Sequence, residues 1–367
     1  MKRIAGLLFF LGVFLYNVPA AAEPAAAAVI EEKTGRVLYA LNEEQELPMA
    51  STTKIMTALL AIENCDLQEA VTAGENAFGV PGTSIYLEKG ETLTLEQMLY
   101  GLMLASGNDA AVAIAEHVGG SMEAFCEMMN LRAAELGCLH THYATPHGLP
   151  ADDHYTSALD LCRIARQAMT MPFFRQVVST QRATIPWENH AYERVLNNKN
   201  KLLSTYPGAI GVKTGYTKAA GRCLVFAAER DGMTVIGSVL NCPDWFDQSA
   251  RLLDQAFAEY DRYEALRAGE IVHWLPVSGG TEEGVELITA EALAAPLRAG
   301  ESAEIGFRWP QIQAAGFEKG DRLGTAFLTV NGEELCSVPL IAAQSVPERS
   351  FRYGLGRTGA EWLLVGP

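Results

Sequence analysis

Ser51 and Lys54, three positions apart, could supply a nucleophile together with its own base. A serine hydroxyl attacks a carbonyl effectively only when a neighbouring base removes its proton. Apolar residues recur at helical spacing over 55–62, which predicts that Ser51 opens a buried helix whose first backbone N–H groups can face an oxyanion. Residues three apart share one helix face, so the Lys54 amine would lie beside the Ser51 hydroxyl. An apolar surrounding would favour its neutral, proton-accepting form.

A second hydroxyl and an amide occur in the tripeptide Ser106-Gly107-Asn108. It interrupts a helix predicted over 95–104, which a capping box opens, and an alanine-rich helix predicted from residue 109 onwards. A tight corner between buried helices would point its side chains into an adjoining cleft. There Ser106 could relay a proton, and Asn108 could hold Lys54 or a substrate backbone. Taken alone, the tripeptide is equally typical of a plain turn.

A lysine on a strand supplies the third group, in Lys213-Thr214-Gly215. Strands predicted over 209–212, 222–229 and 233–240 would place this tripeptide in an antiparallel sheet. Because Gly215 has no Cβ, a substrate backbone could lie against the strand and pair with it. Lys213 and Thr214 would then hold a terminal carboxylate. The N–H of Tyr216, the next residue, would complete an oxyanion hole with the N–H of Ser51.

The order of these motifs, Ser-x-x-Lys, Ser-x-Asn and Lys-Thr-Gly, resembles that of the penicillin-binding proteins and serine β-lactamases. Each motif alone is common by chance, and only the ordered set is specific. The segments 145–149, 155–160 and 197–203 resemble one branch, the low-molecular-mass serine D-alanyl-D-alanine carboxypeptidases, and the resemblance extends from about Ala28 to Val346. Two departures are that Lys199 replaces the usual arginine, and that no arginine occurs near Trp245, where several relatives carry one facing the substrate carboxylate.

The resemblance implies an α+β fold. A β-lactamase/transpeptidase-like domain, with helices on both sides of an antiparallel sheet and a helical subdomain, would be followed by a small all-β sandwich. It also implies removal of the terminal D-alanine from the peptidoglycan stem pentapeptide through an acyl-enzyme, with β-lactam antibiotics as covalent inhibitors and with no cofactor or metal. The catalytic residues would be Ser51, Lys54 and Ser106, and the substrate-binding residues would be Asn108, Lys213, Thr214, Gly215 and Tyr216.

Two other functions stay open at this stage. One is a β-lactamase, because the segment Glu193–Asn197 imitates the Glu-x-x-Leu-Asn that activates water in one class of those enzymes. Glu193 lies only 20 residues before Lys213 (213 minus 193), which is too near for that element. The other is a catalytically idle, penicillin-binding module of the cell wall. An endopeptidase that cuts cross-links is a closer variant.

A second Lys-Thr-Gly, Lys33-Thr34-Gly35, precedes the serine and is predicted to be a hairpin turn. The histidines at 140, 142, 147 and 154 suggest a zinc peptidase instead, but no His-Glu-x-x-His occurs, and His147 is expected to order its loop.

The chain divides into four predicted segments. Residues 1–22 read as a secretory signal, since two cations precede an apolar run and a small-residue cleavage site. Residues 23–263 form the serine DD-peptidase domain, ending in a helix over 248–263. Residues 264–347 form the β-sandwich, in which Pro339 suggests an edge strand. Residues 348–367 form a tail, a candidate for a weak peripheral contact with the membrane.

Composition favours an exported protein. The net charge is −16, and removal of Lys2 and Arg3 with the signal makes it −18, which argues against nucleic-acid binding. The expected location is the extracytoplasmic face of the membrane or the cell-wall space. Seven cysteines at scattered spacing, an odd number, predict mainly buried free thiols rather than a disulfide framework.

Overall fold

The computed structural model describes residues 23–187 and 189–349. The predicted signal, 1–22, and most of the predicted tail, 350–367, lie outside the described residues. The helices are α1 (Lys54–Asn64), α2 (Leu95–Tyr100), α3 (Asn108–Gly119), α4 (Met122–Glu135), α5 (Ala158–Met169), α6 (Pro172–Ser179), α7 (Leu202–Thr205) and α8 (Trp245–Glu259), with a 3₁₀ turn η1 (Ala50–Thr53) and a π-helical segment η2 (Gly101–Ala105).

The first domain is built on an antiparallel five-stranded sheet in the order β2-β1-β9-β8-β7. Its strands are β1 (Ala26–Glu31), β2 (Val37–Leu41), β7 (Ala209–Thr217), β8 (Gly221–Arg230) and β9 (Met233–Leu240). Two short hairpins, β3 (Ala70–Thr72) with β4 (Thr92–Thr94) and β5 (Arg182–Ile185) with β6 (Arg194–Asn197), lie outside it. The sheet predicted around Lys213 is confirmed, and β7 is its edge strand.

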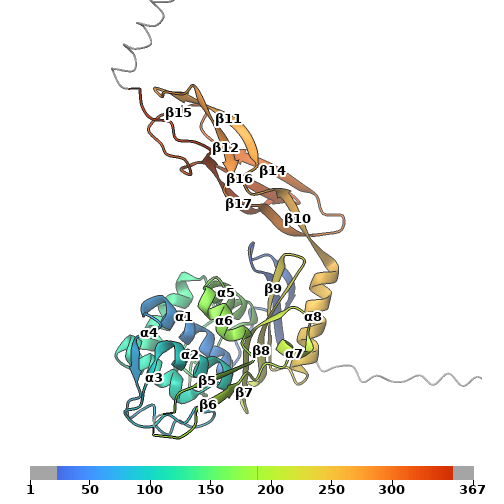
Figure 1. The fold of residues 1–367 in the computed structure, drawn as a ribbon. Helices are drawn as coiled ribbons and strands as arrows, with labels where there is room; N and C mark the ends of the chain where they lie inside the picture. Colours follow the sequence, from blue (N-terminus) through green and yellow to red (C-terminus); the bar gives the residue numbers. More distant parts are fainter. Residues whose placement is uncertain (1–22, 188, 350–367) are drawn as a thin grey trace, which may run out of the picture.

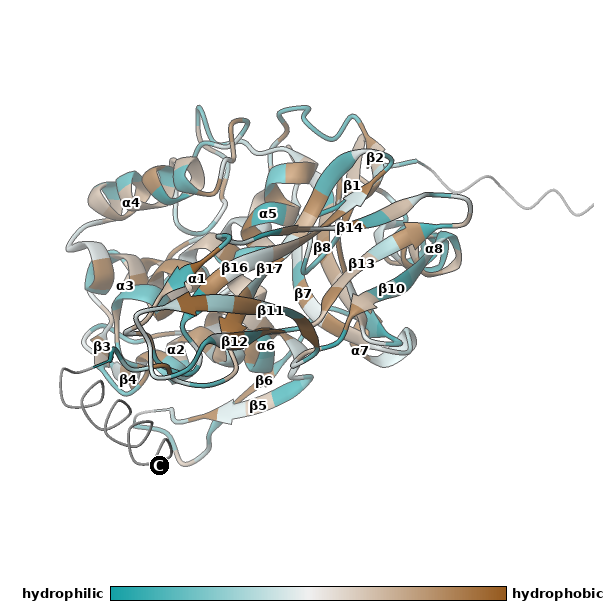
Figure 2. Cartoon of the chain, turned by 90° about the horizontal axis from the view of Figure 1, so that it is seen from above, coloured by the Kyte–Doolittle hydropathy of each residue, from teal (hydrophilic) through white to brown (hydrophobic). Residues whose placement is uncertain are grey.

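Helices cover both faces of this sheet (Figure 1). On one face, the large apolar core joins α5 and α6 to the helical group α1–α4. On the other face, a smaller core packs α8 against β8 and β9. Helix α5, which packs on the sheet, carries both hydrophilic and hydrophobic residues (Figure 2), and its buried residues recur at helical spacing on one face. The predicted fold of this domain is confirmed.

The remaining strands form a second, all-β domain that extends away from the first (Figure 1). They are β10 (Tyr260–Leu266), β11 (Ile271–Ser278), β12 (Gly284–Thr289), β13 (Leu293–Arg298), β14 (Ala303–Arg308), β15 (Gln313–Ala314), β16 (Arg322–Val330) and β17 (Glu333–Ala342). Six of them make the sheet β14-β16-β17-β12-β11-β15, and β10 pairs with β13. This domain has an apolar core of its own.

Two local predictions were wrong here. The helix expected to reach Tyr263 ends at Glu259, and Tyr260 begins β10, so the predicted boundary after residue 263 falls inside a strand. Helical spacing continues as far as Tyr260, but its backbone pairs with Arg298 of β13, and its side chain is buried in the core between α8 and the sheet. Pro339 lies in β17, which is central rather than an edge strand. The proline is tolerated because β17 pairs with β12 only from Leu340 onwards.

The free-thiol prediction is confirmed, since all seven cysteines are unpaired and five of them are buried. Among the described residues, no helix combines the length and the apolar character that a membrane crossing requires.

Candidate active site

The serine and lysine of the first motif lie at the start of a largely buried helix. Ser51 belongs to η1, and Lys54 is the first residue of α1, whose next seven residues are all buried. The Lys54 side chain is itself fully buried, and its Nζ lies 3.1 Å from Ser51 Oγ. The helical contact predicted from the spacing of three is therefore present.

Two further oxygen atoms surround the Lys54 amine. Nζ lies 2.7 Å from Asn108 Oδ1 and 2.6 Å from the carbonyl oxygen of His147. Burial lowers the pKa of Lys54 well below its usual value, and the positive charges of Lys213 and Lys199 lower it further. A neutral amine has two N–H donors and one lone pair. If the donors bond Asn108 and His147, the lone pair is left for the Ser51 hydroxyl proton.

The second motif is a strained corner between two helical segments. Helix α2 begins with the predicted capping box at Thr94 but passes into η2, and Ser106 follows in the left-handed region at φ 65°. Its Oγ is buried and makes no hydrogen bond with the described residues. A buried hydroxyl with no protein partner is costly unless a ligand or water satisfies it. The corner therefore presents an unused proton donor and acceptor.

Asn108 opens α3 and fixes the position of Lys54. Its Oδ1 accepts from the Lys54 amine, while its Nδ2 donates to the carbonyl of Pro81 at 2.6 Å. The two bonds define which end of the amide faces the lysine. Of the two roles predicted for Asn108, the structure displays the contact with Lys54.

The third motif lies on the edge strand β7, beside η1. Lys213 is 1% exposed, and its Nζ donates to the Thr214 carbonyl at 3.0 Å. Burial, together with the nearby charge of Lys199, lowers the pKa of Lys213 to about 7. Because β7 pairs with β8 alone among the described strands, its other edge is available for an extended peptide.

Gly215 is required for a reason that the sequence did not show. A Cβ built on it would lie 3.0 Å from the Met49 carbonyl oxygen, 3.0 Å from the Ser51 nitrogen and 3.1 Å from the Thr52 nitrogen. The absent side chain thus lets β7 approach the turn that holds the serine. The prediction assigned that space to a substrate, whereas the protein's own backbone borders it.

Gly148 makes a similar close approach to the residue before the serine. It has φ +85°, and a Cβ there would come within 1.9 Å of the Ala50 carbonyl oxygen. This glycine belongs to the His-Gly-Leu segment on which the family resemblance rested. Sequence reasoning did not assign it a physical role, and its signal was the glycine within that segment.

One cleft of about 800 Å³ opens over these groups. Six of the eight predicted site residues line it, and Lys54 and Lys213 are buried beside it without lining it. The six are Ser51, Ser106, Asn108, Thr214, Gly215 and Tyr216.

Cleft residues that the prediction did not assign to the site include Lys199, Arg222 and Trp245. Arg222 faces Tyr216 across the β7–β8 pairing, and its guanidinium donates to the Pro243 carbonyl at 2.5 Å. It places a cation at the rim of the cleft, although the residues around Trp245 contain no arginine. Because this position comes from strand pairing, the spacing of sequence motifs could not reveal it.

The loop histidines have individual hydrogen-bond partners. His154 accepts from the Ala144 N–H at Nδ1 and lies 2.9 Å from Thr53 Oγ1 at Nε2, and burial lowers its pKa to about 4. His147 accepts from the Leu149 N–H, which orders the loop as predicted. His142 bonds the Asp153 carbonyl, and His140 pairs with Glu46. These contacts make His154 a neutral structural residue behind η1.

The two misleading motifs lie away from the cleft. Lys33-Thr34-Gly35 forms the turn between β1 and β2, as predicted, and the Glu31 carboxylate accepts from the Lys33 and Thr34 N–H groups. Glu193 is exposed, immediately precedes β6 and does not line the cleft. The observation that favoured a β-lactamase therefore has no counterpart beside Ser51.

Comparison with known proteins agrees with this geometry. The family model for D-alanyl-D-alanine carboxypeptidase matches residues 16–244, and the model for the C-terminal domain of penicillin-binding protein 5 matches 260–348. The chain is 35% identical to D-alanyl-D-alanine carboxypeptidase DacF of Bacillus subtilis over 93% of this chain and 90% of that protein. It is also 36% identical to D-alanyl-D-alanine carboxypeptidase DacB2 of Mycobacterium tuberculosis, over 66% of this chain and 85% of that protein.

A solved structure supports the same assignment. Penicillin-binding protein 5 of Haemophilus influenzae superposes with a TM-score of 0.72 at 26% identity, covering 90% of this chain and 99% of that one. The match includes both domains. Together with the ordered motifs around the cleft, these matches show that the chain belongs to the D-alanyl-D-alanine carboxypeptidase family.

Proposed function

We propose that this protein is a serine D-alanyl-D-alanine carboxypeptidase that removes the terminal D-alanine from peptidoglycan stem pentapeptides. The observation that carries the proposal is the buried Lys54 amine, which lies against Ser51 Oγ while Asn108 and His147 occupy its other sides. This arrangement supplies a base at the nucleophile without a histidine.

The reaction follows from the positions of these groups. Lys54 takes the Ser51 proton as Oγ bonds the carbonyl carbon between the two D-alanines. The N–H groups of Ser51 and Tyr216 hold the resulting oxyanion. The C–N bond then breaks, and the proton passes from Lys54 through the Ser106 hydroxyl to the departing amine. Water next attacks the ester, gives a proton to Lys54 and restores the Ser51 hydroxyl.

The remaining site residues hold the substrate. The substrate strand would pair with the free edge of β7 at Gly215, and the terminal carboxylate would lie against Lys213 and Thr214. Arg222, at the rim, adds a second cation for that carboxylate. A penicillin would acylate Ser51 in the same position, because its strained ring amide takes the place of the D-Ala-D-Ala amide.

Export to the extracytoplasmic face of the membrane or the cell-wall space belongs to the same proposal, since the substrate lies there. A peripheral membrane contact through the tail, residues 348–367, would keep the enzyme near newly made peptidoglycan.

The deciding experiment is to measure free D-alanine released from a diacyl-L-Lys-D-Ala-D-Ala peptide. We expect stoichiometric release and covalent labelling of Ser51 by a fluorescent penicillin. Rapid nitrocefin turnover without D-alanine release would indicate a β-lactamase. Cleavage of cross-linked muropeptides alone would indicate an endopeptidase, and failure of both labelling and release would indicate an idle binding module.

The pH profile of kcat/KM should be bell-shaped. Activity requires neutral Lys54, so it rises as pH increases through the lowered pKa of that amine. It also requires charged Lys213, so activity falls as pH increases through the Lys213 pKa, which is about 7 in the free enzyme. Lys213→Arg should remove the alkaline decline, because a guanidinium does not deprotonate in this range. A wild-type kcat/KM that still climbs above pH 8 would contradict the charged role of Lys213.

Lys199 should set the position of that alkaline decline. Its charge lowers the pKa of Lys213, so Lys199→Met is expected to move the decline to higher pH. Lys201→Met is the matched control, because Lys201 also lines the cleft but is not among the charges that lower the pKa of Lys213. The measurement is kcat/KM for D-alanine release across pH 5–10. Identical shifts in both variants would mean that general surface charge, rather than Lys199, tunes the site.

Gly215→Ala should lower activity about a hundredfold while reducing stability little. The added methyl must push β7 from η1 by a few tenths of an ångström, which misaligns the carboxylate site with the nucleophile. Gly35→Ala in the other Lys-Thr-Gly is the matched control. Gly35 has φ +73°, so that variant should lose thermal stability but keep its specific activity. Equal activity losses in the two variants would refute the role given to Gly215.

A further inference from the structure

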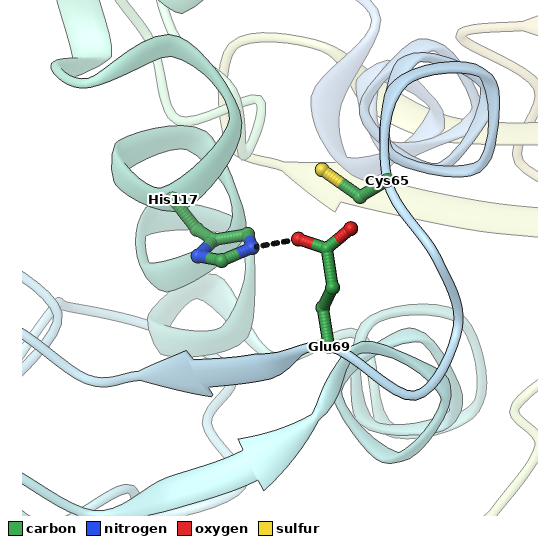
Figure 3. A group of neighbouring side chains, drawn as sticks. All are labelled: Cys65, Glu69 and His117. Atoms are coloured by element: carbon green, nitrogen blue, oxygen red, sulfur yellow. Dashed lines mark hydrogen bonds and ion pairs between the residues drawn. The ribbon is translucent and has the colours of Figure 1, made fainter.

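A second cluster of reactive side chains lies on the helical subdomain, outside the cleft. Cys65 Sγ, a Glu69 carboxylate oxygen and a His117 ring nitrogen all lie within 4.8 Å of one another (Figure 3). Among the described residues, this is the one group of three potential metal ligands that gathers so closely. None of the three takes part in the proposed peptidase reaction.

The two helices that carry the active site end at this cluster. Helix α1 begins at Lys54 and is followed by Cys65, which caps its end, while α3 begins at Asn108 and carries His117 in its last turn. Eleven helical residues span about 16 Å, so the cluster is remote from Ser51. Glu69 lies just before β3, and Figure 3 shows it reaching between the two helix ends. A ligand held here would tie together the far ends of the helices whose near ends share the Lys54–Asn108 hydrogen bond.

The geometry fits a tetrahedral ion. His117 Nε2 lies 3.2 Å from Glu69 Oε2. Bonds of about 2.0–2.1 Å from zinc to nitrogen and oxygen separate two tetrahedral ligands by about 3.3 Å, so this pair already has the required spacing. The other carboxylate oxygen of Glu69 accepts from the Asp66 N–H at 2.7 Å, which orients the carboxylate. Only the Cys65 side chain, half-buried and without a hydrogen bond among the described residues, needs a small rotation.

The chemistry of the donors selects the metal. A thiolate and an imidazole favour zinc over calcium and magnesium, which prefer all-oxygen sites. The last turn of α3 presents the negative end of a helix dipole, which also favours a cation.

We propose that Cys65, Glu69 and His117 bind one zinc ion, with water as the fourth ligand, and that this ion clamps the ends of α1 and α3. The side chains of His117 and Glu69 are 25% and 44% exposed, so solvent reaches the site and the ion can enter. The clamp stabilises the subdomain and leaves the peptidase chemistry to the cleft.

The test uses the mature chain, stripped of metal with a chelator and kept reduced. Zinc titration by calorimetry is expected to show one ion per chain and a raised melting temperature. Cys65→Ser and His117→Ala should each weaken binding at least tenfold and abolish the thermal shift. Cobalt titration should give a thiolate-to-cobalt absorption band in the wild type that is lost in Cys65→Ser.

Two matched controls separate this site from ordinary surface groups. Cys336→Ser removes the other half-buried thiol, and His140→Ala removes a histidine that pairs with Glu46 but belongs to no group of three close potential ligands among the described residues. Both should bind zinc as the wild type does, and all four variants should release D-alanine at the normal rate. Absence of stoichiometric binding, or binding unaffected by Cys65→Ser, would overturn the proposal without bearing on the peptidase function.

Discussion

Ser51→Ala is expected to reduce D-alanine release by a factor on the order of 10⁴ to 10⁶, to the level set by binding alone. The Ser51 Oγ atom bonds the substrate carbon. Among the described residues, no other hydroxyl is hydrogen-bonded to the Lys54 amine. The measurement is release from the diacyl tripeptide under single-turnover conditions, alongside labelling with fluorescent penicillin. Labelling should vanish together with release.

The variant should still fold, which makes the result interpretable. Ser51 is only partly buried, and alanine suits a 3₁₀ turn, so the melting temperature should change little. Ser204→Ala is the matched control, because Ser204 is exposed on α7 close to the cleft and its hydroxyl donates to the carbonyl of Lys201. Substantial D-alanine release by Ser51→Ala would disprove the assigned nucleophile.

Lys54→Met should lower kcat for acylation by about 10² to 10⁴, the usual contribution of a positioned general base. Methionine fills much of the buried volume but cannot accept the Ser51 proton. It also leaves Asn108 Oδ1 and the His147 carbonyl without their donor, which costs stability. Loss of the buried amine removes a desolvation penalty, which partly offsets that cost.

A pH profile distinguishes a missing base from a damaged fold. With Lys54 gone, the acid limb of the bell should disappear, and hydroxide-driven activity should rise steadily with pH. Lys33→Met, in the turn between β1 and β2, is the control and should retain the wild-type profile. An acid limb that persists unchanged in Lys54→Met would assign the base to another group.

Local sequence was sufficient where the chemistry depends on neighbours along the chain. Ser51 and Lys54 meet because a helix places residues three apart on one face. The capping box at Thr94 and the hairpin turn at Lys33 were likewise predictable from short-range hydrogen bonding. The turn at Arg230-Asp231-Gly232 between two apolar runs located β8 and β9 closely, although both faces of these strands are buried.

Predictions of secondary structure were wrong where the local sequence pattern and the long-range packing disagree. Tyr260 continues the helical spacing of α8, yet pairing with β13 makes it a strand residue. Pro339 carries the local signature of an edge, yet β17 is central because it pairs with β16 on one side and with β12 on the other. Sheet order is set by contacts between distant segments, so no local pattern contains it.

The sequence by itself determined which chemistry this chain can perform, because the ordered motifs name a nucleophile, a base and a carboxylate holder. Only the tertiary structure decided how they work together. It buried Lys54 and Lys213, which lowers the pKa of both amines through desolvation. It also brought Asn108 to Lys54 across 54 residues and pressed Gly215 against the serine turn. The polarity around a side chain and the distances between remote segments are set only when the chain packs. The sequence could therefore predict which residues form the site, but not their charge states or their contacts.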